Sequence, residues 1–212
     1  MNDQISTLKD DLSFMRALAE DGRNGPISGG AFLVAAGGLY AAACLVQWAG
    51  VERIGGLDAQ SAGWSWLVAT GLWILTFFGL LALQHRKPAP PSAVGRVFSV
   101  GWSAVGAAIL VNATAVWIAA ERLHDQALFV CLAPTVLAFY GAAWLVAAAA
   151  ARKAWMLVTG LGAFTLALAM AALVNDPREL LAYAIALVAL LVAPGLYMMR
   201  AAATCSTSAA GA

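Results

Sequence analysis

Charged residues are scarce in this sequence: Asp, Glu, Lys and Arg make up 11% of the 212 residues, against about 25% in ordinary soluble domains. Hydrophobic residues make up 62%, where soluble domains have about 45–50%. This composition excludes a water-soluble globule. It also excludes a disordered chain, because disorder requires low hydrophobicity with high net charge and the formal net charge here is +1. The same small charge leaves no basic surface for nucleic acid.

Histidine is rare, and the motifs of common catalytic sites are missing. A bound metal needs three or four protein ligands. The best-spaced group, Glu121 and His124 with Asp125 beside them, has no second histidine nearby, since the other one is His85. No Gly-x-Ser-x-Gly nucleophile turn and no glycine-rich phosphate loop occurs. We therefore expect no enzyme activity, no metal and no cofactor.

Long apolar runs are what the sequence has in abundance. A helix rises about 1.5 Å per residue, so about 20 apolar residues cross a hydrocarbon core about 30 Å thick. The runs do not alternate as the strands of a membrane β-barrel do, which leaves helices as the way to satisfy the backbone in lipid. The sequence predicts an all-α polytopic membrane protein, with a bundle of six transmembrane helices over residues 31–49, 63–84, 97–120, 127–151, 154–174 and 180–199.

Ionisable residues are absent from the spans, except near their ends. Intramembrane proton relays and cation sites are built from such residues, so ion-coupled transport is not expected. The main polar residues left inside the spans are Asn112 and Thr114 in the third and Thr135 in the fourth. A buried Asn usually forms a hydrogen bond across a helix interface; lining a solute path is the other interpretation. Pro134 and Pro194 lie within spans, where each frees a backbone carbonyl.

Basic residues gather on one side of the predicted membrane. Cytoplasmic loops retain Lys and Arg, so nine basic residues on one side against Arg53, Arg122 and Arg178 on the other place both termini in the cytoplasm. Trp102 and Trp155 fall near the inner boundary, as expected of interfacial indoles. Abundant Ala and more Arg than Lys favour a bacterial origin, and hence the inner membrane. The cytoplasmic group is Lys9, Arg16, Arg23, Arg86, Lys87, Arg96, Arg152, Lys153 and Arg200.

Residues 1–30 precede the first span and predict an amphipathic helix followed by a turn. Ile5, Leu8, Leu12 and Met15 recur at steps of three and four residues, which places them on one helical face. The segment is polar and net acidic at its start, unlike a cleavable signal peptide, so the first span is expected to be retained. The helix lies in the headgroup layer, packs on its own bundle, or docks a soluble partner. Residues 200–212 are expected to be a disordered cytoplasmic tail.

Two features of the sequence, a pair of cysteines and a short repeat, can each be interpreted in two ways. Cys44 and Cys131 lie about one turn below the outer surface in the first and fourth spans; they pair only if those helices are neighbours, and free buried thiols are the favoured interpretation. Trp48-x-x-x-Glu52-Arg53 recurs 69 residues later as Trp117-x-x-x-Glu121-Arg122. Three equivalent helical hairpins would explain the recurrence, and so would convergence on similar interface chemistry.

Small residues predict close helix packing in two spans. They recur at i+4 spacing along one face, which lets two helix backbones approach each other. The neighbouring helix belongs either to the same chain or to a second copy in a homo-oligomer. The small residues are Gly37, Gly38, Ala41 and Ala42 in the first span, and Thr159, Ala163, Ala167 and Ala171 in the fifth.

These observations favour a non-enzymatic multi-pass inner-membrane protein that regulates, anchors or assembles partner proteins. Its expected contact face is the apolar stripe Ile5, Leu8, Leu12 and Met15. The alternative function is a transporter or channel for a small neutral or weakly polar solute, lined by Asn112, Thr114 and Thr135. The bilayer is the expected environment in either case.

Overall fold

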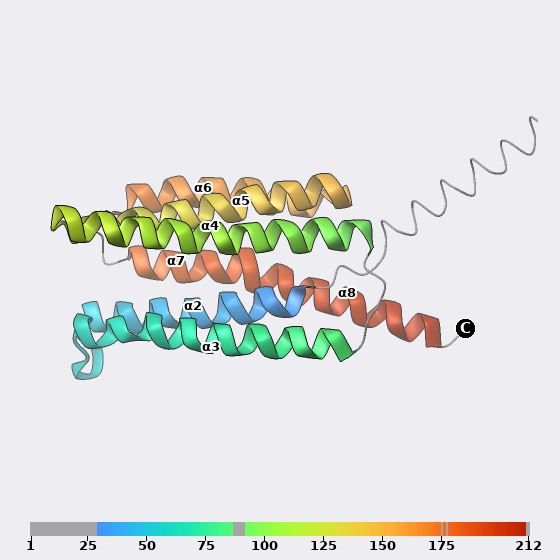
Figure 1. The fold of residues 1–212 in the computed structure, drawn as a ribbon, viewed down its shortest axis with the longest axis horizontal. Helices are drawn as coiled ribbons and strands as arrows, with labels where there is room; N and C mark the ends of the chain where they lie inside the picture. Colours follow the sequence, from blue (N-terminus) through green and yellow to red (C-terminus); the bar gives the residue numbers. More distant parts are fainter. Residues whose placement is uncertain (1–28, 87–91, 175, 177, 211–212) are drawn as a thin grey trace, which may run out of the picture.

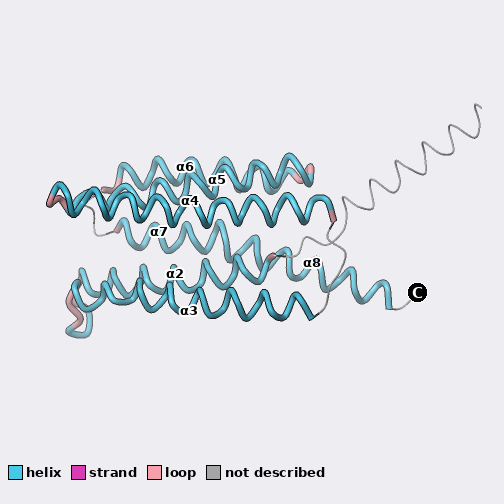
Figure 2. Tube along the Cα trace, viewed as in Figure 1, coloured by secondary structure: helices cyan, strands magenta, loops and turns pink. Residues whose placement is uncertain are grey.

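A computed structural model describes residues 29–86, 92–174, 176 and 178–210. Every regular element in these ranges is helical (Figures 1 and 2), and six helices are long and apolar enough to cross a membrane. The predicted all-α bundle with six spans is confirmed, and the chain is a multi-pass membrane protein. The amphipathic helix predicted before the first span lies outside the described residues.

The six spans follow one another along the chain, and the last is interrupted. Four are single α-helices. The fourth span joins the 3-10 helix η2 to α5, and the sixth consists of α7, a π-helical segment η3 and α8. Another short 3-10 helix, η1, lies between α2 and α3. The elements are α2 Gly30–Val51, η1 Ile54–Gly56, α3 Ala59–Arg86, α4 Ala93–Leu123, η2 Gln126–Cys131, α5 Leu132–Ala151, α6 Ala154–Ala172, α7 Glu179–Leu187, η3 Val188–Val192 and α8 Ala193–Ala210.

The last helix continues into the segment that was expected to be a disordered tail. Helix α8 runs through Ala210. Alanine, which is frequent here, has the highest intrinsic helix propensity. The Thr204 hydroxyl also donates a hydrogen bond to the Ala201 carbonyl, 2.9 Å away, so its polar group is satisfied within the helix.

Side-chain caps mark where two of the spans begin. The Asp58 carboxylate, just before α3, accepts hydrogen bonds from the backbone N–H groups of Gln60 and Ser61 and from the Ser61 hydroxyl. These hydrogen bonds lower the pKa of Asp58, because they stabilise its charged form. The Ser92 hydroxyl caps α4 by accepting from the Gly95 N–H at 3.0 Å.

The helices form two groups. Helix α2 packs against α3 on one side and against α7, η3 and α8 on another, while α5 packs against α4 and α6. In Figure 1, α4, α5 and α6 lie together at the top, α2 and α3 at the bottom, and α7–α8 between them. Because α6 has little contact with α7, the bundle is not built from three equivalent hairpins.

Glycines allow the closest helix contacts, and the neighbouring helices belong to the same chain. A Cβ on Gly30 would lie 2.5 Å from the Gly195 carbonyl oxygen, and one on Gly141 would lie 3.1 Å from that of Gly160. The predicted faces are partly confirmed. Gly37 and Ala41 on α2 and Ala163 and Ala167 on α6 are buried, and Thr159 is half-buried, whereas Gly38, Ala42 and Ala171 are exposed.

Two adjacent glycines provide a matched test of this packing. A Cβ on Gly37 would lie 2.7 Å from Leu191 Cβ, whereas a Cβ on Gly38 would meet nothing within 4 Å. We expect Gly37→Leu to lower the free energy of unfolding by about 1–3 kcal/mol, as overpacking does, and Gly38→Leu to leave it nearly unchanged. Unfolding of both variants in mixed micelles measures the difference. Equal losses would contradict the assigned α2–η3 contact.

The centre of the bundle is apolar, while α3 and α4 expose most of their surface. Leu75 on α3 is 72% exposed and Val111 on α4 is 68% exposed, which suits contact with lipid. No charged side chain is buried among the described residues. The largest fully buried side chains are Trp144, Leu137, Met156, Met170, Leu187, Leu191 and Cys44.

Candidate functional site

None of the three predicted intramembrane polar residues forms a hydrogen bond to another helix in the described part of the chain: the two threonines bond to backbone carbonyls nearby in sequence, and the Asn112 amide nitrogen has no partner. The Thr114 hydroxyl donates to the Leu110 carbonyl at 2.8 Å on α4, and the Thr135 hydroxyl to the Cys131 carbonyl at 2.7 Å at the start of α5. The amide nitrogen of Asn112 is buried and has no partner in the described part of the chain. No hydrogen bond there joins any two of Asn112, Thr114 and Thr135.

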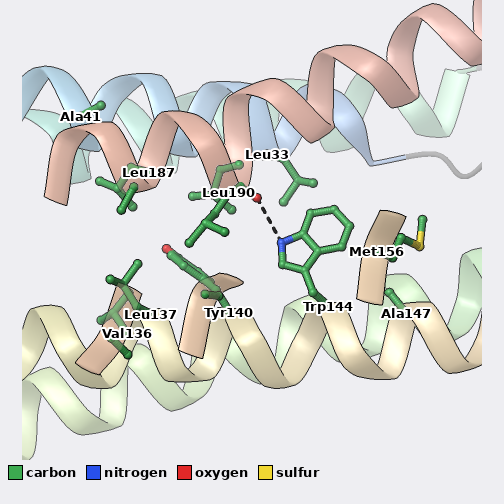
Figure 3. Close-up of a cluster of buried hydrophobic side chains, with 14 of the residues drawn as sticks. Leu33, Ala41, Val136, Leu137, Tyr140, Trp144, Ala147, Met156, Leu187 and Leu190 are labelled. Carbon is green, nitrogen blue, oxygen red and sulfur yellow. Dashed lines mark hydrogen bonds between the residues drawn. The ribbon is translucent and has the colours of Figure 1, made fainter. Parts of the chain in front are cut away.

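Large side chains occupy the space between the two helix groups. Trp144 and Leu137 of α5 meet Leu187 of α7 and Leu190 of η3 (Figure 3), and all four belong to one continuous core. Trp144 is fully buried, at 0% exposure. The middle of the bundle is therefore built as a packed apolar core.

One hydrogen bond joins the groups across this core. The Trp144 indole N–H donates to the Leu190 carbonyl at 3.0 Å, shown as the dashed line in Figure 3. In a regular α-helix that carbonyl would accept from the residue four positions later, which is Pro194 and has no N–H. Trp144 thus supplies the donor that the proline removes, at a π-helical turn of the kind often found at functional sites.

Trp144 is also the centre of an aromatic cluster that links α4, α5, α6 and α8. Its ring centroid lies 5.5 Å from those of Trp102 and Trp155, and Trp155 lies 5.3 Å from Tyr197. The indole N–H groups of Trp102 and Trp155 are buried without a partner among the described residues. The sequence placed these two indoles at the membrane interface, but it gave no signal that they meet around one side chain.

A second polar cluster contains three tyrosines and a cysteine. The Tyr40 hydroxyl of α2 lies 3.2 Å from the Thr70 hydroxyl of α3. Tyr140 of α5, Tyr183 of α7 and Cys44 of α2 are buried in one core, and Tyr40 packs against that core. We call Tyr40, Cys44, Tyr140 and Tyr183 the tyrosine cluster. Sequence analysis selected Cys44 only as a possible disulfide partner and did not select the three tyrosines, because a lone intramembrane tyrosine has no spacing that distinguishes it from core.

Metal and disulfide chemistry find no support in the described residues. No three His, Cys, Asp or Glu side chains lie together there as a metal site would require. His85 in the last turn of α3 and His124 just after α4 are at opposite ends of the bundle. Cys44 is buried, Cys131 is exposed, and both are free thiols.

The predicted partner-contact residues belong to the N-terminal segment. Ile5, Leu8, Leu12 and Met15 lie outside the described residues. Comparison with known proteins adds nothing to their assignment, because no family model, curated protein or solved structure matches this chain.

Proposed function

We propose that the protein is a non-enzymatic inner-membrane protein that regulates, anchors or assembles partner proteins. Its contact element is the N-terminal segment, with Ile5, Leu8, Leu12 and Met15 on one face. The six spans hold this segment at the membrane. The proposed orientation places both termini in the cytoplasm, where a soluble regulator would meet the apolar stripe.

The observation that carries the proposal is the packed, apolar centre of the bundle. A solute path needs convergent polar groups along a wetted interior. Here the middle is occupied by fully buried residues such as Trp144 and Leu137, and the described part of the chain buries no charged side chain. Asn112, Thr114 and Thr135 form no shared hydrogen-bond network. This arrangement favours a rigid anchor over a conduit.

The charge of the N-terminal segment favours a protein partner over a lipid surface. Residues 1–23 contain three basic residues and five acidic ones. Such a segment lacks the polybasic pattern that binds anionic lipid strongly. A protein surface that offers an apolar groove is therefore the better match for the stripe, by the helix-in-groove mode of recognition.

The test introduces one negative charge on or off the stripe. We expect Leu12→Glu to reduce the partner recovered with the tagged protein at least tenfold, because an ionised carboxylate is costly to bury in an apolar interface. Ser13→Glu adds the same charge to a different face and should leave recovery unchanged. Quantitative mass spectrometry of affinity-purified membranes measures both.

Membrane insertion of each variant is checked in parallel, and Asn112→Leu provides the comparison with solute passage. Recovery of the same proteins with the parent and with Leu12→Glu would overturn the docking proposal. Loss of solute flux in Asn112→Leu, with Leu12→Glu unaffected, would support the alternative function instead.

A further inference from the structure

Charge is divided unevenly between the two ends of the bundle. All acidic residues of the described chain lie near the points where α2, α4 and α6 end and where α3, η2 and α7 begin. The opposite end, at the right of Figure 1, has basic residues and no acidic residue among those that the structure describes. We call it the basic end, and its charge is positive whichever side of the membrane it faces. Its basic residues are Arg86, Arg96, Arg152, Lys153 and Arg200.

Three of these basic residues flank one pair of aromatic rings. Trp155 of α6 and Tyr197 of α8 meet edge to face, with ring centroids 5.3 Å apart. Arg152 and Lys153 directly precede α6, and Arg200 lies three residues after Tyr197, on the same side of α8. The backbones of α6 and α8 have little direct contact, so this ring pair joins the two helices at the basic end.

The basic residues beside the ring pair have no counter-charge in the described part of the chain. Arg152, Lys153 and Arg200 are exposed, and none of them forms an ion pair with another described residue. Arg152 ends α5 in the left-handed conformation, at φ 51°, and Lys153 begins the next helix, so a tight turn holds both charges at the basic end. These charges are open to an anionic group from outside the bundle.

Exposed apolar surface continues from the basic residues toward the middle of the spans. Val158, one turn after Trp155 on α6, is 69% exposed. On the last span, Leu196 is 41% exposed, and Ile185, about three turns farther from the basic end, is 69% exposed. A molecule that matches this surface is anionic at one end and apolar along its length. A phospholipid with an acidic headgroup has both properties.

We propose that α6 and α8 bind an anionic phospholipid at the basic end of the bundle. Lys153 and Arg200 contact its phosphate, the Trp155 and Tyr197 rings lie at the level of its glycerol, where aromatic side chains are favoured, and its acyl chains follow the exposed apolar residues of both helices. The site requires neither the N-terminal docking function nor a particular orientation in the membrane, so either proposal can fail alone.

The N-terminal segment is the competing occupant of the basic end. It is net acidic, and it precedes α2, which begins at this end. A segment lying across the end of the bundle would meet the charges alone, whereas a lipid meets both the charges and the apolar surface that continues from them. The lipid is therefore the better match for the whole surface.

Native mass spectrometry of the detergent-solubilised full-length protein tests the site. The protein is titrated with dioleoyl phosphatidylglycerol, which is anionic, or with dioleoyl phosphatidylcholine, which has the same acyl chains and no net charge. We expect the anionic lipid to bind more tightly. Lys153→Gln/Arg200→Gln should lower its affinity by about tenfold or more, because each Lys or Arg at an anionic lipid surface contributes about fivefold.

The matched control is Arg86→Gln/Arg96→Gln, which removes the same charge from the same end but from α3 and α4, and which should leave the affinity nearly unchanged. Circular dichroism checks that both double variants keep their helices. Equal affinity for the two lipids, or equal losses in the two double variants, would overturn the site.

Two further titrations identify the occupant. Millimolar inorganic phosphate should not displace phosphatidylglycerol, because it has no acyl chains to contact the apolar surface. Removal of residues 2–23 should leave the affinity for phosphatidylglycerol unchanged. Displacement by phosphate would assign the charges to a soluble anion, and a rise in affinity after the deletion would assign them to the N-terminal segment; either result would overturn the lipid proposal.

Discussion

Trp144→Ala should lower the free energy of unfolding by about 3–5 kcal/mol, the range for large buried aromatic residues replaced by alanine. The side chain is fully buried and contacts the rings of Phe98, Trp102 and Trp155. Its removal leaves a cavity at the junction of the two helix groups. Denaturant unfolding in mixed micelles, followed by tryptophan fluorescence and circular dichroism, measures the loss.

Trp144→Phe separates the hydrogen bond from the packing. The ring remains apolar, but the Leu190 carbonyl loses its indole donor, and Pro194 has no N–H to replace it. A buried acceptor left without a donor costs about 1–3 kcal/mol, and the smaller ring adds to this loss. Trp117→Ala is the matched control, because Trp117 is 55% exposed. Equal losses for Trp144→Ala and Trp117→Ala would contradict the core described above.

Labelling of single cysteines with an impermeant reagent should show which side of the membrane each end of the bundle faces, because a site is either labelled on intact cells or it is not. Gln60 is exposed at the start of α3, on the side that the basic residues predict to be external. We expect a membrane-impermeant maleimide to label Gln60→Cys on intact cells. It should label Cys205 only after the cells are permeabilised, because the C-terminus is predicted to be cytoplasmic.

The labelling is made unambiguous by removing the other reactive thiol. Cys131 is exposed, so both measurements use a Cys131→Ser background, and the Gln60→Cys measurement also carries Cys205→Ser. Cys44 is retained because it is fully buried. Labelling of Cys205 on intact cells would reverse the orientation and place the N-terminal segment on the wrong side for a cytoplasmic partner.

The spans could be predicted because their signal is local. About 20 consecutive apolar residues are enough to identify a membrane helix, and the end of each run fixes its ends to within a few residues. The effect of Pro194 was also local: a proline in a helix frees the carbonyl four residues earlier. The sequence could not show that the donor for Leu190 is Trp144, 46 positions away along the chain.

Neighbours among the helices could not be predicted, since small and apolar residues occur on almost every face. The pattern of Gly37, Gly38, Ala41 and Ala42 predicted a close contact, but two of the four residues are exposed. The repeat suggested by Trp48 and Trp117 pointed to three hairpins, whereas the packing pairs α2 with α7–α8.

The tyrosine cluster illustrates the same limit for the candidate site. Tyr40, Tyr140 and Tyr183 come from three helices, and each one alone resembles ordinary core. Only the packing of the helices brings Tyr140 and Tyr183 into one core, against which Tyr40 packs. Asn112 was selected because it is the most polar group in a span, yet its buried amide has no partner in the described structure.

The most direct test of the proposed function compares the tagged full-length protein with a variant that lacks residues 2–23. Both are confirmed to insert in the membrane, affinity-purified from native membranes, and analysed by quantitative mass spectrometry. The docking proposal predicts at least one protein that is recovered with the full-length chain and lost from the shortened one. Identical recovered proteins from both would contradict it and shift the function to the membrane bundle itself.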